Sequence, residues 1–515
     1  MLTTISRLQG EKQDERQGDK RDLARPMWLL GMLLLLLPRL IDVNAYIDSD
    51  EASSVLLASN HFGDFIAKAL KDRPHPPLHV LFLHTLAQLR LDTALLGRLV
   101  GIAGSIAGFG LMARMILRET TSTVIMISSM LMFAFSSYFL YLSTTIRPYS
   151  LIIPLGCAQL YFFISMLGAA RESGQKISSA DARLRGWLIF SILLTCTQYL
   201  SVPVTGTEFI LLTTVLNRQA LVRAIVLPGL AVLALAIWYY LGSLNSPSLT
   251  ATWWVTEKPD AREYIYTLLT FFGAAPASAL WLGAVLALVY LNALRQWRLL
   301  TACDGALAAV ALVPTLAVFL LSSLGPLNIF AQRQLIVPAV ALVVLTCALT
   351  RLMRRPWQMS CLVLIVAWAA SSLPMGLPRY SKPPLAQMAA SFARHGVKLV
   401  YTTSWEYSGL RYYGGRRFEV VALSPPLAVP GGEPSGEVGF VCRPGKCDAI
   451  ASFIRASGLR VCGQRFRWNM VNYALAGEVL VFLPAAATLR AGDTCDASLL
   501  PANAGIPHSA TSAAR

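Results

Sequence analysis

The chain has 515 residues, of which 55% are hydrophobic and only 14% are charged, and its mean hydropathy is +0.54. A soluble domain carries roughly a quarter charged residues, so the composition excludes an ordinary soluble protein. It also excludes a largely disordered chain, a collagen and a disulfide scaffold. A polytopic membrane protein remains. The net charge of +16 is then explained by basic cytoplasmic loops, which orient membrane helices, rather than by nucleic-acid binding.

The apolar runs predict a bundle of membrane spans. Residues 1–25 are polar and mixed in sign, which indicates a disordered cytoplasmic tail. The first run, 28–41, lacks a small-residue cleavage site, so we interpret it as an uncleaved span that opens a transmembrane domain over 26–377. Because a span needs about 20 apolar residues, we expect about eleven in all. The others lie near 95–117, 121–142, 149–170, 187–204, 205–217, 222–242, 264–294, 303–323, 334–350 and 357–377.

Loop charges orient these spans. With the N-terminus inside, every loop assigned to the cytoplasm is basic, as the positive-inside rule requires. An odd number of spans places the C-terminus on the far side. The pair across 187–217 is interrupted by Pro203 and Gly206. The basic residues of these loops are Arg118, Arg171, Lys176, Arg183, Arg185, Arg218, Arg223, Arg295, Arg298, Arg351, Arg354 and Arg355.

The C-terminal region is more polar and predicts a separate domain. Strand-like runs at 397–401, 418–421 and 479–482 are separated by Gly and Pro. We therefore expect a mixed α/β domain over 378–500 outside the membrane, followed by a disordered tail at 501–515.

Cysteines of this region favour disulfides. An even number in an oxidising compartment predicts two bonds, with three pairings open. Zinc is the less favoured alternative, because Cys442 and Cys447 do not have a CxxC spacing. The residues concerned are Cys442, Cys447, Cys462 and Cys495.

The loop after the first span, 42–94, is external by the charge argument and rich in carboxylates. Apolar periodicity predicts surface helices over 52–71 and 78–90. Ser49 or Asp50 as a helix cap explains part of the acidity. Capping alone does not explain three carboxylates within four residues, Asp48, Asp50 and Glu51, at the membrane edge. The functional alternative is a general base that faces a lipid-borne substrate.

Other candidates lie on the same external side. His75, before Pro76-Pro77, either belongs to a stiff turn or hydrogen-bonds a substrate. Arg147 and Arg333 violate the positive-inside trend, so they either reach lipid headgroups or bind phosphate.

The loop 243–263 and the acid Glu208 each allow two interpretations. The loop 243–263 holds Trp253, Trp254, Lys258 and Arg262, typical of an aromatic belt or of a sugar-stacking surface. Glu208 lies within an apolar run, where acids mark functional sites, but a position near the break in that run indicates the surface. The sequence has no glycine-rich phosphate loop, HExxH motif or nucleotide fingerprint.

Together these residues resemble the polytopic lipid-linked sugar transferases of the GT-C superfamily, nearest to the protein O-mannosyltransferase and lipid A aminoarabinose transferase branch. Asp50-Glu51 matches the family's acidic pair in the first external loop, His75-Pro76-Pro77-Leu78 its His-Pro-Pro-Leu turn, and Arg147-Pro148-Tyr149 its Arg-Pro-Tyr element. Arg333 and Pro338 match more loosely, and Tyr412-Tyr413 is similar to a strand-and-tyrosine pattern in the family's exported domain. Thr144-Thr145-Ile146 departs from the family, which commonly has an acid there.

The resemblance implies an inverting glycosyltransferase of the bacterial inner membrane, with its N-terminus cytoplasmic and its C-terminal domain periplasmic. The donor is a sugar on a polyprenyl phosphate, and the acceptor is a lipid, glycan or protein. Asp50 and Glu51 are the implied catalytic residues, with Asp50 as the base. No cofactor is required, although a divalent metal is compatible with the chemistry. The implied substrate-binding residues are His75, Arg147, Tyr149, Arg333 and Lys258.

Two other functions compete with transfer. A transporter or flippase of lipid-linked glycans also needs many spans and external charge, but it is typically built from internal repeats with midplane charges. A polysaccharide polymerase or ligase is expected to place its important residues in a large late external loop. Here the motifs concentrate in 42–150, which favours the transferase.

Overall fold

The computed structural model of the chain describes residues 29–41, 43, 47–71, 76–89, 91–119, 122–244, 258–273, 278–325, 328–376, 384–403, 406–423, 438–442, 447, 450, 454, 461–470 and 475–484. The expected tails at 1–25 and 501–515 lie outside these residues, as does His75. The chain divides into two compact units. The helical unit comprises Met1–Val43, Leu70–His79 and Leu96–Leu377, and the mixed unit comprises Asn44–Ala69, Val80–Leu95 and Pro378–Arg515.

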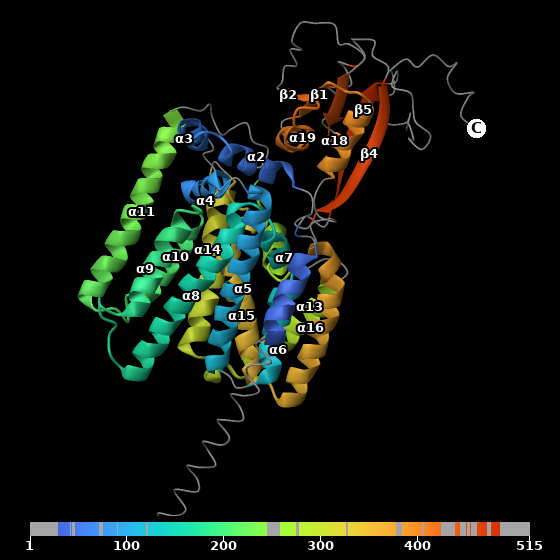
Figure 1. Ribbon diagram of the computed structural model, residues 1–515. Coiled ribbons are helices and arrows are strands. Elements are labelled where there is room, and N and C mark those ends of the chain that lie inside the picture. Colours follow the sequence, from blue (N-terminus) through green and yellow to red (C-terminus); the bar gives the residue numbers. More distant parts are fainter. Residues whose placement is uncertain are drawn as a thin grey trace, which may run out of the picture. The chain divides into compact units, whose positions relative to one another are not determined.

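The helical unit is a bundle of apolar helices (Figure 1). A helix at Leu29–Leu40 comes first. The others are α5 (Thr93–Glu119), α6 (Thr123–Phe135), α7 (Ser137–Ser143), α8 (Pro148–Ser173), α9 (Ala182–Thr195), α10 (Ser201–Leu212), α11 (Arg218–Leu244), α12 (Ala261–Thr270), α13 (Ala279–Arg295), α14 (Ala302–Leu324), α15 (Ile336–Leu349) and α16 (Arg355–Gly376).

Fewer helices reach the length of a membrane span than the sequence predicted. Among the described residues, five are long and apolar enough, α5, α8, α11, α14 and α16, and the bent pair α6 and α7 makes six. The helices at Leu29–Leu40, Ser201–Leu212, Ala279–Arg295 and Ile336–Leu352 are apolar but shorter. The expectation of eleven spans is therefore not confirmed, whereas the mainly helical apolar bundle is.

Helix breaks differ from the sequence-based boundaries. The run 264–294 contains two helices, α12 and α13. The interruption in 187–217 falls between Thr195 and Ser201, before Pro203 rather than at it. Pro203 lies in the first turn of α10, where a missing backbone N–H breaks no hydrogen bond within the helix. The predicted surface helix 52–71 is also divided, into α2 (Ser49–Ala58) and α3 (Phe62–Lys71).

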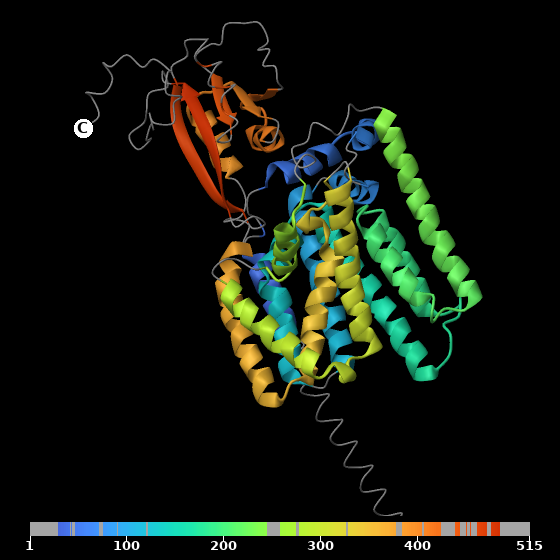
Figure 2. The same cartoon turned by 180° about the vertical axis from the view of Figure 1, so that it is seen from behind.

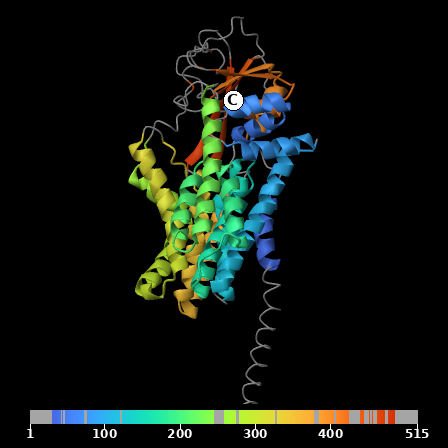
Figure 3. The same cartoon turned by 90° about the vertical axis from the view of Figure 1, so that its left-hand side faces the viewer.

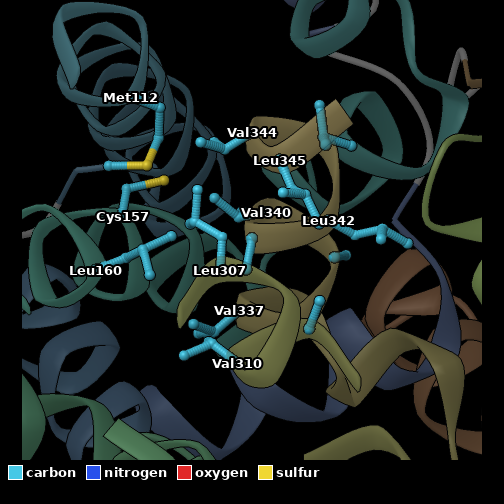
Figure 4. Close-up of a cluster of buried hydrophobic side chains, with 14 of the residues drawn as sticks. Met112, Cys157, Leu160, Leu307, Val310, Val337, Val340, Leu342, Val344 and Leu345 are labelled. Carbon is cyan, nitrogen blue, oxygen red and sulfur yellow. The ribbon is translucent and has the colours of Figure 1, made fainter. Parts of the chain in front are cut away.

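The core of the helical unit surrounds α15, all of whose residues are buried. Figure 4 shows side chains of α5, α8, α14 and α15 converging on it, among them Met112, Leu160, Leu307 and Val340. A helix that is apolar all round suits such a buried position. Figure 3 views the unit from the side of α11, whose apolar residues are largely exposed, as expected of a helix that faces lipid.

Glycines allow two close helix contacts. On α5, a Cβ atom at Gly104 would lie 2.9 Å from Cγ of Pro154 in α8. On α8, a Cβ atom at Gly156 would overlap Cγ2 of Val337 in α15. Small residues let membrane helices approach in this way, because packing rather than the hydrophobic effect drives their association. α8 is therefore held tightly between α5 and α15.

The C-terminal part of the mixed unit is a five-stranded sheet with strand order β2-β1-β3-β5-β4. β1 (Leu399–Thr403) runs parallel to β2 (Glu419–Leu423) and β3 (Val438–Cys442), and β5 (Leu475–Pro484) runs antiparallel to β3 and β4 (Val461–Met470). Figure 2 shows the long β4–β5 hairpin from behind. α18 (Leu385–Arg394) buries Met388 and Phe392 against Val400 and Val441. The prediction of a small mixed α/β region is confirmed, although β3 and β4 were not foreseen.

The tyrosine pair and the cysteines of this region can also be compared with the sequence-based expectations. Tyr412 and Tyr413, which were matched to a strand-and-tyrosine pattern, lie in α19 (Tyr407–Gly414), between β1 and β2. Cys442 and Cys447 form a disulfide, which is one pair of the predicted two. Cys495 and the side chain of Cys462 lie outside the described residues.

A buried ion pair closes the end of the bundle where α14 begins and α15 ends. Arg351 donates through Nη1 to Oδ1 of Asp304 at 2.9 Å and through Nη2 to Oδ2. The Asp304 carboxylate also accepts from the backbone N–H of Thr301, forming a capping box. Only 14% of the Arg351 side chain and 6% of the Asp304 side chain are exposed.

Replacing Arg351 with alanine is expected to destabilise the protein by roughly 3–5 kcal/mol, because it leaves a buried carboxylate unpaired. The exposed Arg354, three positions along, provides a matched control whose alanine variant should unfold like the wild type. Thermal unfolding of the solubilised protein measures the difference. Equal midpoints for the two variants would contradict the structural role of the pair.

Candidate functional site

The carboxylates predicted as catalytic lie at the start of α2, in the mixed unit. Asp48 is the helix cap: its Oδ1 accepts from the Glu51 backbone N–H at 2.8 Å, and Glu51 Oε2 accepts from the Asp48 N–H at 3.0 Å. The cap is therefore neither Ser49 nor Asp50, as the sequence had indicated. Glu51 is fully buried, whereas Asp50 is half-buried in the first turn. Of these two residues, Asp50 is the one accessible to a substrate.

The C-terminal end of α2 is fixed by α4 (Pro77–Gln88). The Nδ1 atom of His84 lies 2.8 Å from the carbonyl oxygen of Ala58, so Nδ1 carries the proton and donates. The imidazole stacks on Phe65 of α3, with ring centroids 4.4 Å apart and an interplanar angle of 14°. His84 therefore joins the three helices of the first loop. The sequence analysis did not identify His84, although a histidine among the apolar residues of the predicted helix 78–90 indicated a buried polar contact.

Arg147 lies where α8 begins, in the helical unit. It is the N-cap residue, with Pro148 at the first helical position, and its carbonyl accepts from Oγ of Ser150 at 3.0 Å. The preceding Thr144 and Thr145 are buried, and each hydroxyl donates to a carbonyl of α7. These bonds fix the turn. Thr144 and Thr145, which stand where the resembled family commonly has an acid, therefore have a local structural role.

Arg333 joins Arg147 at this end of α8. It lies in the 3₁₀ turn Gln332–Gln334, which leads into α15. Its guanidinium carbon is 5.9 Å from the ring centroid of Tyr149, in the first turn of α8. The hydroxyl of Tyr138 donates to the Gln332 carbonyl at 2.7 Å and holds the turn in place. The structure thus brings Arg333 and Tyr149 together, two residues from Arg147.

Sequence reasoning missed Arg39, which supports the same region. Arg39 is fully buried in the helix Leu29–Leu40. It donates to the carbonyl of Phe133 (3.0 Å), at the C-terminal end of α6 where a helix dipole favours a cation, and to Oγ of Ser143 (3.0 Å) at the end of α7. These bonds stabilise the 58° bend between α6 and α7, and with it the start of the Arg147 turn. An arginine ending an apolar run was the available signal.

The remaining candidates are the two tryptophans and Lys258 of the loop 243–263, and the acid Glu208. Trp253 and Trp254 lie outside the described residues. Lys258 is exposed ahead of α12 and forms no ion pair with a described residue. Glu208 is fully buried, so a surface position for it is wrong, and its Oε2 accepts from Nε1 of Trp187 at 2.7 Å. Glu208 therefore joins α10 to α9.

The described residues contain no group of three or more His, Cys, Asp or Glu that could hold a metal ion. Arg147 and Arg333 both bring positive charge to the start of α8, where the positive end of the helix dipole also favours a bound anion.

No protein-family model and no curated protein matches the chain. Solved structures do. ArnT from Cupriavidus metallidurans bound to undecaprenyl phosphate superimposes with a TM-score of 0.52 and 13% identity, covering 91% of this chain and 99% of ArnT. The apo state of that protein gives a TM-score of 0.51 and 12% identity, covering 93% and 99%. The chain therefore has the fold of ArnT, and its long apolar helices make it a multi-pass membrane protein.

Replacing Gly156 with alanine should destabilise the bundle by about 1–3 kcal/mol, since its Cβ would overlap Val337 where α15 begins. Gly168, on the same helix, is the matched control, because a Cβ atom added there would meet open space. Its alanine variant should gain about 0.5–1 kcal/mol. Thermal unfolding separates the two, and a Val337→Ala change should partly restore Gly156→Ala. Identical behaviour of the two glycine variants would contradict the close contact.

Proposed function

We propose that this protein is an inverting glycosyltransferase that uses a sugar on a polyprenyl phosphate. The observation that carries the proposal is the arrangement at the start of α8, where the Arg333 guanidinium lies over Tyr149 in the helix that Arg147 caps. A guanidinium fork matches phosphate geometry, and a helix N-terminus adds backbone donors. ArnT, whose fold this chain has, was solved with undecaprenyl phosphate bound, which supports the same class of donor.

On the donor side, Arg147 and Arg333 stabilise the phosphate as it leaves. The bond between the anomeric carbon and the phosphate oxygen breaks, and its electron pair stays on the phosphate. Charge therefore grows on a group that already faces guanidiniums, which lowers the barrier electrostatically. A phosphate leaves without protonation, so no general acid is needed there. Tyr149 holds the Arg333 guanidinium by a cation–π contact.

On the acceptor side, Asp50 is the general base. A hydroxyl or amine of the acceptor attacks the anomeric carbon from the face opposite the phosphate, and its proton passes to the Asp50 carboxylate. Attack from that face inverts the anomeric configuration. Glu51 serves this step indirectly, because its carboxylate caps the N-terminus of α2. His75 and Lys258 remain proposed substrate-binding residues. The N-terminus is proposed to be cytoplasmic, with Asp50 and the C-terminal sheet on the periplasmic side.

The acceptor is a lipid, glycan or protein of the envelope. A flippase remains the alternative function. The buried Glu208 is the intramembrane acid that a transporter would use, but it forms a hydrogen bond between neighbouring helices.

Replacing Asp50 with asparagine should lower sugar transfer by about 10²-fold or more, since removal of a general base costs on this order. Affinity for the polyprenyl-phosphate sugar should stay unchanged. The measurement is transfer of labelled sugar from polyprenyl phosphate in membranes. Asp64→Asn is the control, because Asp64 is an exposed carboxylate in the first turn of α3. Labelled lipid that crosses the membrane without transfer, unaffected by Asp50→Asn, would establish the flippase instead.

Replacing Arg333 with lysine should weaken binding of polyprenyl phosphate on the order of tenfold, because lysine keeps the charge but loses the planar fork. Arg147→Lys should act in the same direction. Binding of polyprenyl phosphate to the purified protein, followed by intrinsic fluorescence, measures the effect. The exposed Arg262 of α12 supplies the control, Arg262→Lys. If all three variants bind equally, the phosphate site lies elsewhere.

A further inference from the structure

The helix that carries Asp50 is held at its N-terminal end by the C-terminal sheet domain, which comprises the five-stranded sheet with α18 and α19. Ile47, directly before the cap residue Asp48, is buried, and its backbone N–H donates to Oη of Tyr413 at 2.5 Å. Tyr413 lies on α19, and both segments belong to the mixed unit. The hydrogen bond therefore links the first loop to a residue 366 positions later in the chain.

A second contact lies one helical turn earlier on α19. Gly409 is buried, and a Cβ atom there would lie 2.9 Å from Oγ of Ser49 and would overlap Cδ1 of Leu385. Real Cβ atoms essentially never lie this close to another atom. The glycine thus allows α19 to touch the first residue of α2. Because residues four apart share one helix face, Gly409 and Tyr413 form a single docking face.

The other face of α19 packs into the hydrophobic core of the C-terminal sheet domain. Leu410 is fully buried in the core that α18 and the sheet share, together with Leu385 and Phe418. The docking face is therefore supported by the hydrophobic core of the C-terminal sheet domain and does not lie on a loop. Rigid support of this kind is what a general base needs, because a shift of about 1 Å in a catalytic group costs up to ~10²-fold in rate.

We propose that α19 is a positioning element, in which Tyr413 and Gly409 fix the N-terminal turn of α2 and so set the place of Asp50. This inference rests on the proposed role of Asp50 and deepens it. The C-terminal sheet domain then takes part in acceptor activation through the backbone of α2, without itself contacting the reacting atoms. Tyr413 satisfies the Ile47 N–H, so the turn that the Asp48–Glu51 capping box closes does not fray.

The first test replaces Tyr413 with phenylalanine in the full-length protein and follows backbone amide exchange over 47–51. Loss of one hydrogen bond is worth about 1 kcal/mol, so exchange of these amides should accelerate about fivefold. The turnover number should fall on the order of tenfold, while the KM for the polyprenyl-phosphate sugar stays unchanged. Tyr407→Phe is the matched control: it removes a hydroxyl from the same helix, and that hydroxyl accepts from Arg411 within α19. Equal exchange and equal turnover in the two variants would overturn the proposal.

The second test uses the glycine contact. Because a Cβ atom at Gly409 would also overlap Cδ1 of Leu385, all variants of this test are made in a Leu385→Val background, which lacks that atom. Gly409→Ala should then slow transfer, and Ser49→Ala in the same protein should partly restore it by removing the Oγ atom 2.9 Å away. Gly414→Ala is the control, because its Cβ would instead overlap Phe418 inside the domain. A defect that Ser49→Ala does not relieve, equal to that of Gly414→Ala, would reduce the role of Gly409 to domain stability and count against positioning.

The two proposals fail in different ways. If Asp50→Asn leaves transfer intact, the proposed base is wrong, whatever α19 does. If Asp50→Asn abolishes transfer while Tyr413→Phe changes neither amide exchange nor turnover, the base stands and the positioning role of α19 falls. The amide measurement needs no substrate, so it reports on the contact even in an inactive protein.

Discussion

The tight packing of α8 is the constraint on which the proposed phosphate site depends. α8 contacts α5 through Gly104 and α15 through Gly156, and neither position has room for a side chain. Since α15 follows directly after the Arg333 turn, its closeness to α8 is what places a guanidinium over Tyr149. Buried helices of fixed separation thus hold two arginines that are far apart in sequence. The site gains its rigidity from apolar packing between the helices, together with the polar bonds that fix the turns before α8 and α15.

The neighbouring carboxylates of α2 illustrate how one short motif serves structure and chemistry at once. Glu51 is withdrawn into a capping box, and this same bond orders the turn from which Asp50 projects. A pair of adjacent acids therefore need not be a pair of catalysts. Asp48, which lies outside the Asp-Glu motif, completes the cap. Arg39 has a comparable structural role in the bundle, because its buried guanidinium donates to the carbonyl groups of Phe133 and Ala134 at the helix bend.

Composition and periodicity predicted the apolar bundle, the mixed sheet region and the turn at Arg147, because each depends on local pattern. The expectation of eleven spans is not confirmed. The break between α12 and α13 within the run 264–294 was overlooked, although Gly273 and Pro276 mark it in the sequence. The family motifs pointed to Asp50, Arg147 and Arg333 as candidates. The contact of Arg333 with Tyr149 and that of Tyr413 with Ile47 were out of reach, because they join segments far apart in sequence. The helix cap was misplaced by one or two residues, because Ser49 and Asp50 are of residue types that cap helices as well as Asp48 does.

The distance in sequence between Ile47 and Tyr413 has a consequence for biosynthesis. The ribosome makes α2 early and α19 only after every helix of the bundle has been completed. During that interval the Ile47 N–H lacks the tyrosine hydroxyl that accepts its hydrogen bond, and the Asp48–Glu51 capping box is already available to order the turn. The order of synthesis therefore means that the N-terminal turn of α2 gains its contact with α19 only after the C-terminal sheet domain has been made and has folded.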